Sequence, residues 1–197
     1  TEMNNKKDTI CAIATASGTA ALSIIRMSGD RSHEIATSVF SRKGKELKIK
    51  DIIHNRMYYG EFIDNDGKTL DDVMITFFRA PYSYTGEASV EIACHGSVFI
   101  QNKIMEVLIS NGARLADPGE YTMRAFINGK MDLTQAEAVA DIISSKNEAE
   151  HRVAMNQLKG GFSNQLKILR RNILDLTSLM ELELDFSEED VEFADRT

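Results

Sequence analysis

The sequence predicts an α+β domain followed by an all-α region, because its pattern of apolar residues changes once along the chain. Up to residue 117, short segments rich in Ile, Val and Thr alternate with single helical segments, which is typical of α+β domains with a mixed sheet. Beyond Pro118 the apolar residues recur only at helical spacing. We therefore place one domain at residues 1–117 and the first part of an incomplete helical domain at residues 118–197.

The strands expected in the first domain are short, rich in β-branched residues and bounded by turn-forming residues. They cover residues 9–15, 21–27, 57–63, 73–78, 88–94 and 114–116. The sequence Asp64-Asn65-Asp66-Gly67 consists of turn-forming residues and predicts a hairpin between the third and fourth of these strands. Apolar residues spaced three and four apart predict flanking helices at 30–40 and 98–109.

Three helices are expected in the second part. Asp132 is well placed as the N-cap of the first, with Gln135 completing a capping box, and a second helix at about 147–159 ends before two glycines. The third helix carries the clearest pattern, an apolar stripe with steps of four and three residues: Phe162, Leu166, Leu169, Ile173, Leu176 and Met180. Such a stripe needs a covering partner. A bundle core within this chain is the favoured interpretation, and a helix from missing sequence or from another subunit is the alternative.

The charge of the chain is concentrated at one end. Its net charge is -7, and residues 181–197 hold eight acidic side chains and one basic one, so residues 1–180 are neutral. Proteins that wrap a nucleic-acid duplex normally show a basic excess, because neutralising phosphates provides much of their affinity. If the protein acts on an RNA, we therefore do not expect this chain to provide most of the binding affinity.

The two cysteines and the hydropathy pattern indicate a cytoplasmic protein that does not enter a membrane. Cys11 and Cys94 lie far apart in a chain without a signal-peptide pattern, and no apolar run approaches the roughly 18 residues needed to span a bilayer. We expect both thiols to be reduced.

Three glycine-containing segments could suggest a binding or catalytic site: Ala16-Ser17-Gly18-Thr19, Asn128-Gly129-Lys130 and Cys94-His95-Gly96. No GxxxxGK[ST] phosphate loop occurs in the chain, so its own residues give no argument for nucleotide binding. Cys94-His95-Gly96 could hold a nucleophile or a metal ligand, but the remaining histidines form no second cluster. The favoured interpretation is a strand-to-helix turn that needs a small residue at Gly96, and we predict neither a catalytic residue nor a metal site.

Glu91 and Arg26 are the polar residues of most interest within the expected strands. Glu91 points away from the face of Val90 and Ile92, and a carboxylate can accept the two parallel N–H donors of an aminopyrimidine such as a pterin or guanine. The spacing alone favours a solvent-facing Glu91. Arg26 is by default a salt-bridge partner and alternatively an anion clamp.

Several segments in order resemble the N-terminal part of the MnmE (TrmE) family of tRNA-modifying GTPases. They are residues 24–29, 83–87, 90–96, 118–138 and 185–190. The resemblance implies a folate-binding α+β domain related to the glycine-cleavage T-protein, followed by the first part of a helical domain. The family's GTPase domain and last helices would lie outside this chain.

The resemblance also implies a ligand and its contacts. In the family the N-terminal domains form a homodimer that holds 5-formyltetrahydrofolate near the interface, and the folate-contacting positions fall on Arg26, Glu91 and Lys130. Glu91 suits the paired donors of the pterin, whereas Arg26 and Lys130 suit its carbonyls and glutamate carboxylates. Where the family often has Pro-Pro-Gly, this chain has Ala16-Ser17-Gly18, which implies a more flexible loop before Arg26.

The parent protein would hydrolyse GTP with Mg²⁺ and K⁺ and work with the flavoprotein MnmG (GidA) on the wobble uridine of tRNA. Folate would supply the one-carbon unit of an aminomethyl-type modification. Without a phosphate loop, this chain should have no GTPase activity. The alternatives are a folate-dependent one-carbon transferase of the T-protein type, which requires a complete bilobal fold, and a dimerisation module with a vestigial folate pocket.

Overall fold

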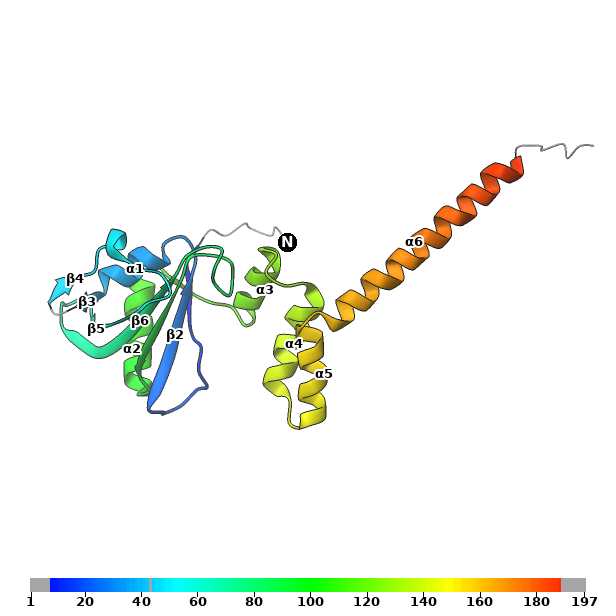
Figure 1. Ribbon diagram of the computed structural model, residues 1–197. Helices are drawn as coiled ribbons and strands as arrows, with labels where there is room; N and C mark the ends of the chain where they lie inside the picture. Colours follow the sequence, from blue (N-terminus) through cyan, green and yellow to red (C-terminus); the bar gives the residue numbers. More distant parts are fainter. Residues whose placement is uncertain (1–7, 43, 189–197) are drawn as a thin grey trace, which may run out of the picture. The chain divides into compact units, whose positions relative to one another are not determined.

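The computed structural model describes residues 8–42 and 44–188. The chain divides into two compact units, Thr1–Met131 and Asp132–Thr197. Figure 1 draws their described residues from blue to green and from green to red.

A single mixed sheet of eight strands forms the centre of the first unit. Its neighbours follow the order β4-β3-β5-β6-β7-β2-β1-β8, and every pair is antiparallel except β1 with β8. The strands are β1 (Ile10–Ile13), β2 (Leu22–Ser28), β3 (Phe40–Arg42), β4 (Lys45–Glu46), β5 (Met57–Ile63), β6 (Thr69–Phe78), β7 (Ser89–His95) and β8 (Arg114–Leu115). The α+β class, the mixed sheet and the β5–β6 hairpin are thus confirmed.

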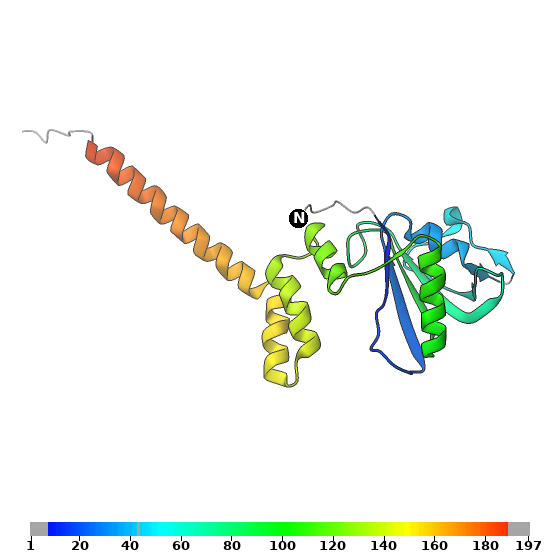
Figure 2. The same ribbon diagram turned by 180° about the vertical axis from the view of Figure 1, so that it is seen from behind.

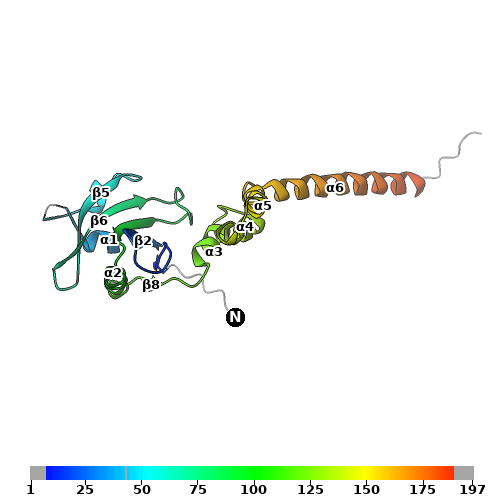
Figure 3. The same ribbon diagram turned by 90° about the horizontal axis from the view of Figure 1, so that it is seen from below.

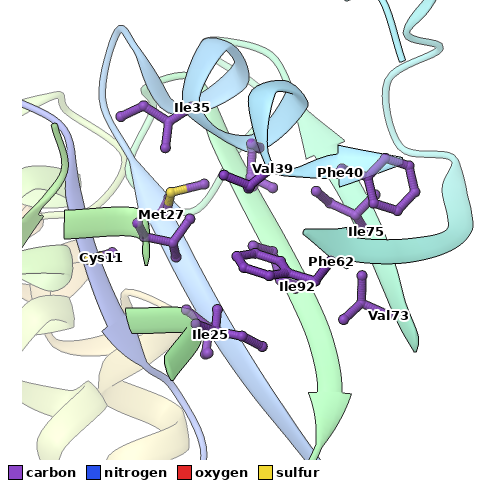
Figure 4. Close-up of a cluster of buried hydrophobic side chains, with 14 of the residues drawn as sticks. Cys11, Ile25, Met27, Ile35, Val39, Phe40, Phe62, Val73, Ile75 and Ile92 are labelled. Carbon is purple, nitrogen blue, oxygen red and sulfur yellow. The ribbon is translucent and has the colours of Figure 1, made fainter. Parts of the chain in front are cut away.

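Two helices, α1 (Ser32–Ser38) and α2 (Val98–Ser110), pack on one face of this sheet. Figures 2 and 3 show α2 lying along that face. Because side chains alternate along a strand, every second residue of β2, β6 and β7 points toward these helices. The strand register sets Ile25, Ile92 and Ile75 side by side, and all three are buried in the core shown in Figure 4.

The other face of the sheet keeps large apolar side chains in contact with solvent. Leu22, Met57 and Tyr59 are 54%, 60% and 64% exposed, although they belong to β2 and β5. The neighbouring positions of β2 and β7 on this face include Arg26 and Glu91. This face therefore carries both the polar residues of interest and an exposed apolar surface.

Four elements of the first unit were not expected from the sequence. They are β3, β4, the 3₁₀ turn η1 (Ile49–Asp51) and the helix α3 (Glu120–Ile127). The last of these moves the domain boundary. Since α3 buries Glu120 and Arg124 among charged side chains of the first unit, the division falls at Met131 and Asp132 rather than at Pro118.

The second unit begins with the helices α4 (Leu133–Ser144) and α5 (Glu148–Leu158), which lie side by side in Figure 1. The expected capping box is present. The backbone N–H of Gln135 donates to the Asp132 carboxylate at 2.9 Å, and the Asp132 N–H donates to the Gln135 side chain at 2.9 Å. Asn147 caps α5 by accepting from the backbone N–H of Glu150 at 3.0 Å.

The long helix α6 (Gly161–Glu188) carries the apolar stripe, and here the favoured interpretation is wrong. Five stripe residues are between 48% and 58% exposed, so the part of the chain that the structure describes does not bury them in a bundle core: Leu166, Leu169, Ile173, Leu176 and Met180. The side chain of Phe162 lies outside the described part.

None of the helices in the described ranges combines the length and the hydrophobicity that a membrane crossing requires.

Candidate functional site

Arg26 and Glu91, which the sequence singled out separately, form one ion pair. The antiparallel register of β2 and β7 sets them directly opposite each other. The Arg26 guanidinium donates from Nε at 3.0 Å and from Nη2 at 2.6 Å, both to Glu91 Oε1. Among the described residues, none donates a hydrogen bond to Glu91 Oε2. One carboxylate oxygen therefore remains available to a ligand, while the other neutralises Arg26.

A cavity of about 200 Å³ lies against this ion pair. Its other wall is the loop that joins β6 to β7, which contributes Tyr82, Ser83 and Tyr84. The lining therefore combines a carboxylate and a guanidinium with aromatic rings and hydroxyl groups. Such a set of groups suits a flat, polar ring, because the tyrosines can stack on its faces while the ion pair binds its edge.

The Arg26 side chain is held in place by two aromatic rings. Its guanidinium carbon lies 5.4 Å from the ring centre of Tyr84 and 5.8 Å from that of Tyr121, within the range of cation–π attraction. The Tyr121 hydroxyl also donates to the Arg26 carbonyl oxygen at 2.6 Å. Burial raises the pKa of Tyr121, so this phenol stays protonated and keeps donating.

Lys130 reaches the loop of the site but does not line the cavity. Its ammonium donates to the Pro81 carbonyl at 3.0 Å, and the nearby Asn128 amide donates to the Thr85 carbonyl at 2.7 Å. Gly86 has a φ of 79°, and a side chain there would press against Lys130 and Asn128. Of the three expected residues, the structure thus brings two into contact and places the third against Pro81 of the same loop, outside the cavity lining.

A cluster of charged residues below this loop was not anticipated from the sequence. Arg124 pairs with Asp8 at 2.8 Å, with Glu120 at 2.9 Å and with Glu87 at 3.2 Å. Glu120 also accepts from Arg114 at 2.6 Å. The only signal in the sequence was the spacing of Glu120 and Arg124, which places the two side chains on one face of a helix.

This cluster shifts the titration of Glu120 strongly. Burial alone would raise the pKa of Glu120, but hydrogen bonds from Arg114, the Asp117 N–H and Arg124 outweigh it and lower that pKa to about 2. Since the Glu120 side chain is only 5% exposed, its charge acts in a region of low dielectric and fixes α3 to the sheet.

The Cys94-His95-Gly96 turn has the structural role expected for it. Burial raises the pKa of the Cys94 thiol to about 11, so the thiol is protonated and unreactive near neutral pH. A side chain at Gly96 would collide with the Ala20 carbonyl oxygen, which explains the need for glycine. The His95 ring pairs with Asp71 at 2.7 Å, and this hydrogen bond raises the pKa of His95.

Metal ligation has no support in the described ranges, where no three or more His, Cys, Asp or Glu side chains gather closely enough to hold an ion.

Comparison with known proteins gives a family match for each of the two units of the chain. Residues 9–130 match the family model described as GTP-binding protein TrmE N-terminus, and residues 133–197 match the MnmE helical domain. Relatives called tRNA modification GTPase MnmE are 54% identical in Flavobacterium johnsoniae, 52% in Porphyromonas gingivalis and 54% in Bacteroides thetaiotaomicron. Each match covers 97% of this chain but only 40% or 41% of the relative, so the chain spans about two fifths of their length. With the first model covering more than half of its residues, the chain belongs to the MnmE (TrmE) family.

Proposed function

We propose that this chain is the folate-binding and dimer-forming part of a tRNA-modifying GTPase, with 5-formyltetrahydrofolate as its ligand. The observation that carries the proposal is the Arg26–Glu91 pair at the wall of a cavity lined by tyrosines.

The residues of the cavity fit the pterin ring of a folate. Glu91 Oε2 has no donor among the described residues, and a carboxylate is the natural partner of the ring's adjacent N–H groups. Tyr82 and Tyr84 offer faces for stacking. When bound, the folate would supply a one-carbon unit, and the residues of this chain would bind and orient its ring.

We assign the other polar groups of the folate to Arg26 and Lys130. Arg26 lines the cavity beside Glu91 and suits the ring carbonyl. Lys130 lies outside the cavity lining with its ammonium on the Pro81 carbonyl, and we assign it to the carboxylates of the glutamate tail.

A second copy of the chain would complete the site. The cavity of about 200 Å³ is smaller than the roughly 300–1,000 Å³ typical of ligand pockets. The same face of the sheet exposes Leu22, Met57 and Tyr59, and an apolar surface of this kind is typical of protein–protein contacts. Both observations support a homodimer in which the partner copy extends the folate pocket.

The activity of the longer parent protein is proposed from its relatives. Their names support GTP hydrolysis in tRNA modification, and we assign to the parent a cytoplasmic location, Mg²⁺ and K⁺ as ions of the GTPase domain, and MnmG as partner at the wobble uridine. The 197 residues contain no phosphate loop, so this chain should neither bind nor hydrolyse GTP.

Isothermal titration calorimetry with 5-formyltetrahydrofolate tests this proposal. We expect saturable binding at micromolar affinity or better, and no heat of binding with GTP. A folded, dimeric chain that does not bind the folate would instead be a dimerisation module with a vestigial pocket.

A further inference from the structure

The first unit is neutral as a whole, but its charges are strongly segregated. Residues 42–56 carry six basic side chains against two acidic ones, a net charge of +4. The rest of residues 1–131 carries ten basic against fourteen acidic side chains, a net charge of -4. A cluster of this kind attracts an anion even when the whole domain has no excess of positive charge.

Four cations of this segment, Arg42, Lys45, Lys48 and Lys50, form an exposed surface that we call the basic edge. Arg42 and Lys45 belong to β3 and β4, at the end of the sheet, and the other two lie at the η1 turn that follows. Tyr58 connects these parts. Its ring lies 5.9 Å below the Arg42 guanidinium, and its hydroxyl accepts from the backbone N–H of Ile53, just after η1, at 2.6 Å.

The side chains that the structure describes do not neutralise the basic edge. Arg42 and Lys45 are direct cross-strand partners, an arrangement of like charges that destabilises a sheet. None of the four cations makes an ion pair with a side chain that the structure describes. By contrast, Arg31, Arg114, Arg124 and Lys103 are each paired with a carboxylate. Among the described side chains of the unit, no carboxylate compensates these exposed like charges.

Protection of the sheet edge explains only part of this surface. Lysine on an edge strand discourages pairing with other sheets, and Lys45 on β4 fits that role. Lys48 and Lys50, however, lie at a 3₁₀ turn, where no strand edge needs protection. Edge protection therefore gives no reason for these two lysines.

We propose that the basic edge binds the phosphate backbone of an RNA. Lysine provides flexible point charges suited to phosphates, and contacts of this type position a nucleic acid without reading its sequence. Ile49 and Ile53 are 52% and 57% exposed beside these cations and offer apolar contacts to the sugars. The inference rests on the proposed role in tRNA modification for the class of RNA, and the neutral charge of the whole unit limits it to a few phosphates.

The test compares two triple variants of the 197-residue chain that change the net charge equally. The edge variant is K45Q/K48Q/K50Q, and the control is K146Q/K159Q/K167Q, whose lysines are exposed in the second unit. Fluorescence anisotropy with a labelled tRNA transcript is measured at several salt concentrations. Each lost phosphate contact lowers the slope of log K against log salt by about 0.7–0.9, so the edge variant should lose about 2 in slope and at least about tenfold in affinity.

The control variant should stay within about twofold of the unmodified chain. Equal losses in both variants, no loss in the edge variant, or no RNA binding by the unmodified chain would overturn the proposal. So would a loss of binding to polyglutamate or to phosphatidylserine vesicles without a loss for RNA, because the surface would then serve an acidic protein or a membrane. Folate titration of the edge variant should be unchanged, which separates this test from that of the folate site.

Discussion

Glu120 shows how one residue of the charged cluster links α3 to the sheet. Its carboxylate accepts from Arg114 and Arg124, and it also accepts from the backbone N–H of Asp117 at 2.8 Å. Arg114 belongs to β8 of the sheet, so its pairing with Glu120 ties α3 to the sheet. Glu120 and Arg124 are both buried, so neutralising Glu120 weakens the compensation of a buried guanidinium and costs more than the loss of an exposed pair would, although Arg124 keeps Asp8 and Glu87.

We predict that Glu120→Gln lowers the free energy of unfolding by about 2–4 kcal/mol at pH 7, with little difference left near pH 2. The folded-state pKa of Glu120 is lowered to about 2 from 4.5, so its stabilisation is present above pH 4.5 and disappears as the pH falls toward 2. Urea unfolding at several pH values measures this.

Glu34→Gln is the matched control for that experiment, because Glu34 pairs with Arg31 while both side chains are more than half exposed. Its effect should be small at every pH, because water and salt screen an exposed pair. A Glu120→Gln effect that is independent of pH would show that the carboxylate charge does not stabilise the fold.

The sequence could identify Arg26 and Glu91 but not their contact. Alternation along a strand shows that Glu91 faces away from Val90 and Ile92, and this needs only local information. The pairing depends on β2 and β7 being neighbours in register, although 65 residues separate the two side chains in sequence. Without the family resemblance, the spacing alone would have predicted that Glu91 faces solvent and binds no ligand.

At the scale of elements, the sequence predicted best those with long apolar patterns. The strand β5 and the capping box of α4 lie where they were expected. The strands β3 and β4 are only three and two residues long, too short for an alternating pattern to be visible. The helix α3 buries Glu120 and Arg124 with Ala125 as its only buried apolar residue, so hydrophobic periodicity could not reveal this helix or the boundary that follows it.

The capping box gives a prediction for the second unit. Asp132→Ala removes the acceptor of the Gln135 N–H and should destabilise this unit by about 1 kcal/mol, whereas Asp132→Asn keeps an acceptor and should cost less. Hydrogen exchange at the first amides of α4 measures the effect. Equal exchange rates in the two variants would mean that the cap contributes nothing to the helix.

At the scale of the whole molecule, the chain leaves two apolar surfaces unburied. The stripe of α6 is about half exposed in the described part, although it has the spacing of a helix that packs against a partner. The open sheet face of the first unit exposes Leu22, Met57 and Tyr59. Whether these two surfaces become buried depends on partners rather than on the chain itself, so the sequence of this chain could not predict their burial.

We predict that the chain forms a homodimer through the open sheet face. Light scattering at tens of micromolar should give twice the chain mass of 22.0 kDa, and Tyr59→Asp should weaken the dimer at least about tenfold, because it places a charge in the interface. Phe99→Asp is the matched control, since Phe99 is also 64% exposed but lies on α2, against the other face. A monomer mass for the unmodified chain, or equal weakening by both variants, would contradict this arrangement.

The central claim is that Glu91 receives the pterin ring of a folate, and calorimetric titration of Glu91→Gln with 5-formyltetrahydrofolate tests it most directly. The variant replaces an acceptor oxygen with a donor amide, and an unmatched donor facing the ring should cost about 1–3 kcal/mol, a loss of roughly 10-fold to 100-fold in affinity. Glu106→Gln serves as the control, because Glu106 lies on α2, on the other face of the sheet and outside the cavity lining. The account predicts a folded Glu91→Gln variant with weakened folate binding beside an unaffected Glu106→Gln variant. Unchanged folate affinity in a folded Glu91→Gln variant would contradict it.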